Sequence, residues 1–123
     1  MPRPIHFEIP ANDPERIGSF YQSVFGWTVQ KWEGGGEPYW LITTGPDGEP
    51  GINGGILKKR DPEQPCVNTV GVGNLDAAIA TVTGNGGTIC VPKMPVPGIG
   101  WLAYGKDPEG NIFGMMQADT SAK

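Results

Sequence analysis

The sequence predicts an α+β protein made of two copies of one module, each consisting of a strand, a helix and three further strands. Two observations predict this class. The 123-residue chain contains 20 glycines and 13 prolines without a short fixed period, which indicates many short elements separated by turns. The two halves also match at a constant offset along the chain, so that Gly26 meets Gly87 and Trp40 meets Trp101. Because a repeat implies the same elements in each copy, the two halves are expected to share one architecture.

The first element is a strand over residues 5–11, "IHFEIPA", in which side chains alternate between two faces. The apolar face carries Phe7, Ile9 and Ala11. The opposite face carries His6, the only histidine, and Glu8. We expect the apolar face to pack against the helix that follows.

That helix is expected over residues 14–25, because Asn12 or Asp13 can cap it and Pro14 needs no amide hydrogen in the first turn. Its apolar residues recur at helical spacing and form one stripe, made of Ile17, Phe20, Tyr21, Val24 and Phe25. In the second half, a helix is expected over residues 75–86, capped by Asn74 and ended by "GNGG".

The remaining strands complete the two modules. They are expected near residues 27–32, 38–44 and 53–58 in the first half, and near 67, 88–92, 100–105 and 111–117 in the second. We interpret residues 1–123 as a single domain, with a first module at 5–59, a linker at 60–66 and a second module at 67–118. The segment "PKMPVPGIG" at 92–100 is expected to be an extended, hinged loop. The glycine clusters at 34–36 and 51–55 are interpreted as turns, because neither has a nucleotide-binding spacing.

The composition excludes several classes of partner. The net charge is −4, and no basic run is longer than "KKR" at 58–60, so nucleic acid is not expected to bind. No segment approaches the roughly 20 apolar residues needed to span a bilayer. We therefore expect a cytoplasmic protein without a membrane partner. Cys66 and Cys90 stand apart from any metal-binding spacing and are expected to be reduced.

The two strand-helix-strand-strand-strand modules, with "DPERIGSFYQSVFGW" in the first and "AYGKDPEGNIFGMMQ" closing the second, resemble the vicinal oxygen chelate superfamily. This superfamily holds glyoxalase I, bleomycin-resistance proteins and extradiol dioxygenases, and the chain is most similar to a glyoxalase-like branch whose activity is not established. The resemblance implies two βαβββ modules that form a curved eight-stranded mixed sheet with the helices on its convex side. It also implies a cavity on the concave face, and a homodimer.

The resemblance further implies four positions for metal ligands, two in each module. In this sequence they hold His6, Gly55, Val67 and Gly114. Among these four residues, only His6 has a side chain with a lone pair that can bind a metal. Transition-metal sites normally use three or four protein ligands. We therefore expect no cofactor, and a divalent metal, for which His6 is the only candidate ligand, is disfavoured.

Three roles stay open for His6: a polar strand residue, a ligand-binding or acid/base group, and a metal ligand. Glu8 is two residues away on the same strand face, about 6.5 to 7 Å along the chain, so the two titrations can couple. These two residues are the candidate catalytic and ligand-binding groups. Four apolar residues are further candidates for the cavity lining: Trp40, Trp101, Ile112 and Met116.

Two main hypotheses for function follow. In the first, the protein binds an unknown small organic molecule in an apolar cavity and lacks the family's metal site. In the second, it is a lyase, isomerase or dioxygenase-type enzyme that uses His6 and Glu8, with or without a divalent metal. A third possibility is an interaction module whose cavity is filled by side chains.

Overall fold

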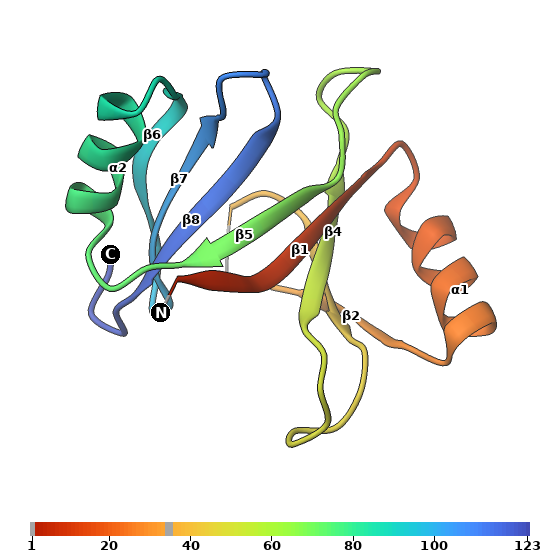
Figure 1. Cartoon of the computed structure of the whole chain (residues 1–123). Helices are drawn as coiled ribbons and strands as arrows, with labels where there is room; N and C mark the ends of the chain where they lie inside the picture. Colours follow the sequence, from red (N-terminus) through yellow and green to blue (C-terminus); the bar gives the residue numbers. More distant parts are fainter. Residues whose placement is uncertain (1, 34–35) are drawn as a thin grey trace. The chain divides into compact units, whose positions relative to one another are not determined.

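The computed structural model describes residues 2–33 and 36–123, and the chain divides into two compact units (Figure 1). The first unit is His6–Cys66, and the second is Val67–Lys123 together with the residues before His6. The first unit holds most of β1 (Arg3–Ala11), then α1 (Pro14–Phe25), β2 (Thr28–Trp32), β3 (Tyr39–Thr43) and β4 (Asn53–Lys58). The second holds β5 (Val67–Gly71), α2 (Leu75–Gly84), β6 (Thr88–Val96), β7 (Gly100–Lys106) and β8 (Ile112–Ala118). The predicted α+β class, with the βαβββ order repeated, is confirmed.

Strand pairing follows the same scheme in both units. The first unit has the order β2-β3-β4-β1, and the second has β5-β8-β7-β6. The first strand of each unit pairs in parallel with its last strand, β1 with β4 and β5 with β8. The other pairs are antiparallel. The pairing is therefore mixed, as predicted.

Helix α1 begins where the sequence predicted, but fewer of its apolar side chains pack against the sheet than the sequence predicted. Asp13 accepts a hydrogen bond from the backbone N–H of Arg16 at 3.2 Å, and the helix ends at Gly26, whose φ of 73° suits glycine. The stripe prediction is only partly right, because Phe20, Val24 and Phe25 are 55%, 53% and 60% exposed.

The helix approaches the sheet most closely at Gly18 instead. Gly18 is buried, and a Cβ there would lie 3.1 Å from Cγ1 of Val29. Ile17 packs against the core cluster of Ala11, Ile42 and Ile56. The narrow contact at Gly18 brings the helix close to the sheet, and the larger side chains further along the stripe stay in solvent.

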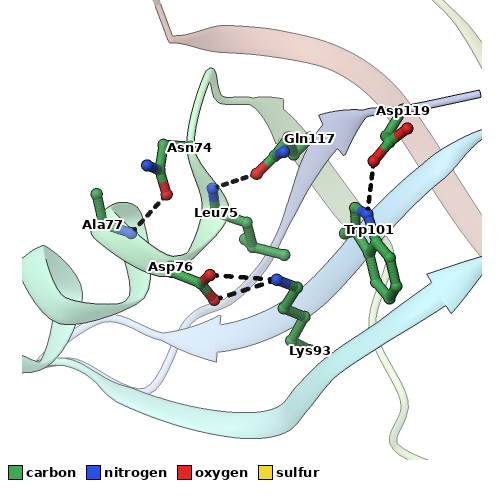
Figure 2. A network of polar contacts seen from close by, with 8 residues as sticks. All are labelled: Asn74, Leu75, Asp76, Ala77, Lys93, Trp101, Gln117 and Asp119. Atoms are coloured by element: carbon green, nitrogen blue, oxygen red, sulfur yellow. Dashed lines mark hydrogen bonds and ion pairs between the residues drawn. The ribbon is translucent and has the colours of Figure 1, made fainter. Parts of the chain in front are cut away.

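Helix α2 lies beside β6, β7 and β8 in the second unit (Figure 1). Asn74 caps it by accepting from the N–H of Ala77 at 3.0 Å, and the N–H of Leu75 donates to Oε1 of Gln117 on β8 at 2.7 Å (Figure 2). The fully buried Leu75 forms the core of this unit with Ala103 and Met115. The helix start is thus fixed to the sheet by both a hydrogen bond and apolar packing.

Three segments that the sequence analysis interpreted need correction or lie partly outside the described residues. The segment at 92–100 was predicted to be a hinged loop, but β6 continues to Val96. Its prolines are tolerated because β6 is an edge strand, with register irregularities between Ile89 and Met94. The interpretation of 51–55 as a turn is wrong from Asn53 onward, where β4 begins, and the strand expected at 53–58 is confirmed. Two residues of the turn expected at 34–36 lie outside the described residues.

Neither helix in residues 2–33 and 36–123 is long and apolar enough to cross a membrane.

Candidate functional site

His6 and Glu8 lie on the same face of the sheet in the first unit. Phe7, Ile9 and Ala11 belong to the core that packs against α1, so the side chains between them point to the opposite face. Strand register adds Tyr39 on β3 and Gly55 on β4 to that face. We call this surface, which carries His6, Glu8, Tyr39 and Gly55, the site face.

Tyr39 connects the two residues predicted from the sequence. Its hydroxyl lies 2.7 Å from Nε2 of His6 and donates to Oε2 of Glu8 at 3.0 Å. Glu8 is 9% exposed and His6 is half-buried, so both hydrogen bonds are partly shielded from water. The three side chains form one polar cluster, His6–Tyr39–Glu8, in which the phenol is the central group.

Gly55 makes this arrangement possible. Glu8 and Gly55 are register partners on β1 and β4, and the side chain of Tyr39 lies across Gly55. A Cβ at position 55 would overlap with the hydroxyl and the ring of Tyr39. The absence of a side chain at position 55 is therefore what lets the phenol reach between His6 and Glu8.

The environment of the cluster keeps the imidazole uncharged at neutral pH. Burial lowers the pKa of His6 below its ordinary value of 6.5, because water no longer solvates the imidazolium, and the carboxylate of Glu8 opposes this only in part. A neutral imidazole can donate through one nitrogen and accept through the other. The cluster can therefore orient a polar group or accept a proton.

Two apolar side chains accompany the cluster on the site face. Trp32 is the register partner of Tyr39, and their rings meet edge to face at 6.3 Å between centroids. Leu41, the register partner of Gly55, is 41% exposed on the same face. Sites for small organic molecules combine mostly apolar groups with a few placed polar groups, and this face carries both kinds.

The structure places Trp40 and Trp101 away from the faces on which we expected them. Trp40 packs against the core cluster under α1, on the opposite face to Tyr39. Trp101 packs against the core cluster of the second unit, and its Nε1 donates to Asp119 at 3.0 Å (Figure 2). Lysine side chains cover both rings, Lys31 over Trp40 and Lys93 over Trp101. Each tryptophan therefore belongs to the core-facing side of the sheet in its own unit.

Ile112 and Met116 lie on the face of the second unit that points away from its core, since Phe113 and Met115 between them pack in that core. Met116 lines an open hollow of about 380 Å³. Its other lining residues are Pro2, Arg3, Ile5, Gly71, Val72, Gly73 and Ala118. Ile112 is not among the residues that line this hollow.

Tyr39 is the site residue that sequence reasoning missed, because aromatic residues in a small sheet protein are more often core than site. One signal was available. Tyr39 and Leu41 share a face by alternation, and a glycine on a neighbouring strand marks a place where another group approaches closely. Without the register between β3 and β4, this signal did not single out Tyr39.

Comparison with solved structures supports the fold. A hypothetical protein from Bacillus halodurans superposes with a TM-score of 0.71 at 15% identity, covering 99% of this chain and 98% of that one. Methylmalonyl-CoA epimerase from Streptomyces coelicolor gives a TM-score of 0.71 at 14% identity, covering 98% and 97%. The epimerase from Mycobacterium tuberculosis gives 0.69 at 13% identity, covering 94% and 87%. The chain thus shares the fold of these structures, which agrees with the architecture that the resemblance implies.

Comparison of the sequence with known families and proteins does not assign the chain to a family. No protein-family model and no curated protein matches the chain. The similarity to the epimerases therefore establishes the architecture only. The chemistry depends on the residues of the site.

The residues at the four metal-ligand positions that the resemblance implies do not fit a metal. In the first unit, His6 is a possible ligand, but the position of Gly55 is covered by Tyr39. In the second unit, Val67 is 7% exposed and apolar, and Gly114 has Oγ1 of Thr69 at 2.8 Å and Cε1 of Tyr104 at 3.3 Å from the place of a Cβ. Among residues 2–33 and 36–123, no three His, Cys, Asp or Glu side chains group together to hold an ion.

Proposed function

We propose that this protein binds a small organic molecule without a metal, and that the His6–Tyr39–Glu8 cluster orients the polar end of that molecule. The observation that carries this proposal is the position of Tyr39. Its hydroxyl fills the space where the family's ligand on β4 would project, and it bonds to both polar residues of β1. The polar groups of β1 are thus held by a phenol, which leaves the cluster suited to hydrogen bonding with a ligand.

The surroundings of the cluster support the same function. Leu41 and Trp32 provide apolar surface beside it, and the half-buried His6 gives a hydrogen bond that water screens only weakly. Burying apolar surface contributes affinity, and a few fixed polar atoms contribute orientation. We propose that the ligand lies over Leu41 with its polar end at His6.

A thermal-shift screen of metabolites and hydrophobic drugs tests this proposal. The protein is first treated with a chelator, and its metal content is measured by elemental analysis. A ligand at about 100 times its Kd raises the free energy of unfolding by about 2.7 kcal/mol, enough for a clear rise in Tm. Binding that persists in chelator and weakens in Tyr39→Phe supports the proposal, whereas binding that appears only after metal is added contradicts it.

A second candidate function is a metal-independent isomerase. The specific observation in its favour is the hydrogen-bonded connection from a neutral imidazole through Tyr39 to Glu8, which can carry a proton. Two of the similar structures above are methylmalonyl-CoA epimerases, and the substrate in that name serves as a probe. Incubation of methylmalonyl-CoA in deuterated water, followed by mass spectrometry, tests this candidate. Deuterium uptake that His6→Ala abolishes supports it, and no uptake excludes it for this substrate.

A further inference from the structure

The hydrogen bonds of the cluster fix where its protons lie. Tyr39 has one hydroxyl hydrogen, and it donates this hydrogen to Oε2 of Glu8. The 2.7 Å contact between Nε2 of His6 and the same hydroxyl oxygen then requires a hydrogen on Nε2. Because the imidazole is neutral, its other nitrogen, Nδ1, carries a lone pair and no hydrogen.

Nδ1 of His6 is an acceptor that has no hydrogen-bond partner among the described residues. Within residues 2–33 and 36–123, the only hydrogen bond of the His6 side chain is the one from Nε2 to Tyr39. No polar side-chain atom in this part of the chain is both fully buried and without a partner, so Nδ1 remains accessible to solvent. An accessible acceptor on a ring held by Tyr39 can receive a hydrogen bond from a bound molecule.

The charges on the site face argue against an anionic ligand. Glu8 contributes a negative charge two residues from His6. The basic residues of strands β2 to β4 point to the other face, since Lys31 lies over Trp40 and Lys58 is the register partner of Ala11. A carboxylate or phosphate at Nδ1 would have no cation of these strands to pair with, and it would meet Glu8.

We infer that the ligand is an uncharged, mainly apolar molecule that donates a hydroxyl or N–H hydrogen to Nδ1 of His6. This inference rests on the proposed function, because it specifies the chemistry of the molecule bound at the same cluster. The donor group of the ligand would hydrogen-bond to Nδ1, and its apolar part would pack against the exposed side chain of Leu41. Molecules that end in a carboxylate, or that offer only acceptors, are excluded.

The tautomer can be measured without any ligand, because His6 is the only histidine in the chain. Long-range ¹H–¹⁵N spectra of protein labelled with ¹⁵N-histidine show one imidazole and need no assignment. We expect a protonated Nε2 and an unprotonated Nδ1 at pH 7.5. In Tyr39→Phe the preference for this tautomer should weaken, while Tyr21→Phe, the same change in α1, should keep it. A protonated Nδ1 in the wild-type protein would overturn the inference and leave the proposed function standing.

A matched series of probes then tests the class of ligand: 2-naphthol, 2-methoxynaphthalene and 2-naphthoate, which share one ring system. We expect 2-naphthol to bind about ten times more tightly than 2-methoxynaphthalene, and 2-naphthoate to bind more weakly than either. The ¹⁵N resonance of Nδ1 should shift with 2-naphthol only. Equal or tighter binding of 2-naphthoate, with the shift absent, would overturn the inference although the protein binds small molecules. If none of the three probes binds, and the wider screen described above finds no ligand, the proposed function fails and the inference fails with it.

Discussion

Gly55→Ala should destabilise the protein by about 1.5 to 3.5 kcal/mol, because the new methyl group takes the space of the Tyr39 side chain. Displacing the phenol breaks its hydrogen bond with His6, which contributes about 1 kcal/mol, and its hydrogen bond to the carboxylate of Glu8, which contributes about 1.5 to 3 kcal/mol. An alanine in place of a strand glycine otherwise favours folding by roughly 0.5 to 1 kcal/mol. The difference between these contributions gives the expected loss.

Urea denaturation of Gly55→Ala measures this loss, and a double mutant separates the cause from a general effect on β4. In a Tyr39→Ala background the methyl group at position 55 no longer meets a phenol, so the same substitution should be neutral or stabilising. Gly45→Ala, where no atom lies within 4 Å of the new Cβ, serves as the control and should cost little. Equal destabilisation by Gly55→Ala with and without Tyr39 would refute the role given to this contact.

Four further predictions concern charge, pH, metal and assembly. Glu8→Gln should lower the pKa of His6 further, because the carboxylate of Glu8 partly offsets the lowering of this pKa by burial. A titration of the single imidazole by ¹H NMR measures the pKa, and a raised value would contradict this prediction. Because the folded imidazole has a lower pKa than the unfolded one, folding stability should fall as the pH drops below 6.5, and His6→Gln should show a shallower fall in denaturant titrations. Elemental analysis of the purified protein should find no stoichiometric transition metal, and close to one tightly held ion per chain would contradict this. Sedimentation at micromolar concentration should give a homodimer, as the fold resemblance implies; a monomer of about 13.1 kDa would contradict this.

The local patterns of the sequence predicted the helices and most strands, and they predicted two residues of the cluster, His6 and Glu8. Alternation along β1 correctly placed Phe7 and Ile9 in the core and left His6 and Glu8 on the opposite face. Capping residues predicted where α1 begins, because a cap depends on a few neighbouring residues. These predictions succeeded because the information lies within one segment of the chain.

The parts of the site that the sequence did not predict depend on contacts between segments. Trp40 and Tyr39 are neighbours on β3, and only the pairing of β3 with β4 decides which of them faces Gly55. Because a shift of one residue in register exchanges the two faces, alternation alone could not choose between them. The exposed Phe20 and Phe25 have a similar origin, since the close approach at Gly18 decides which part of the α1 stripe meets the sheet.

The most direct test of a metal-free site built on Tyr39 is calorimetric titration, in the presence of a chelator, of the tightest ligand that the thermal-shift screen finds. Tyr39→Phe and His6→Ala should each weaken binding by about 5-fold to 150-fold, which corresponds to the loss of roughly 1 to 3 kcal/mol for a buried hydrogen bond. Tyr21→Phe should leave the affinity unchanged. Affinity that is the same in wild-type protein, Tyr39→Phe and His6→Ala, with all three folded, would contradict the placement of the ligand at this cluster.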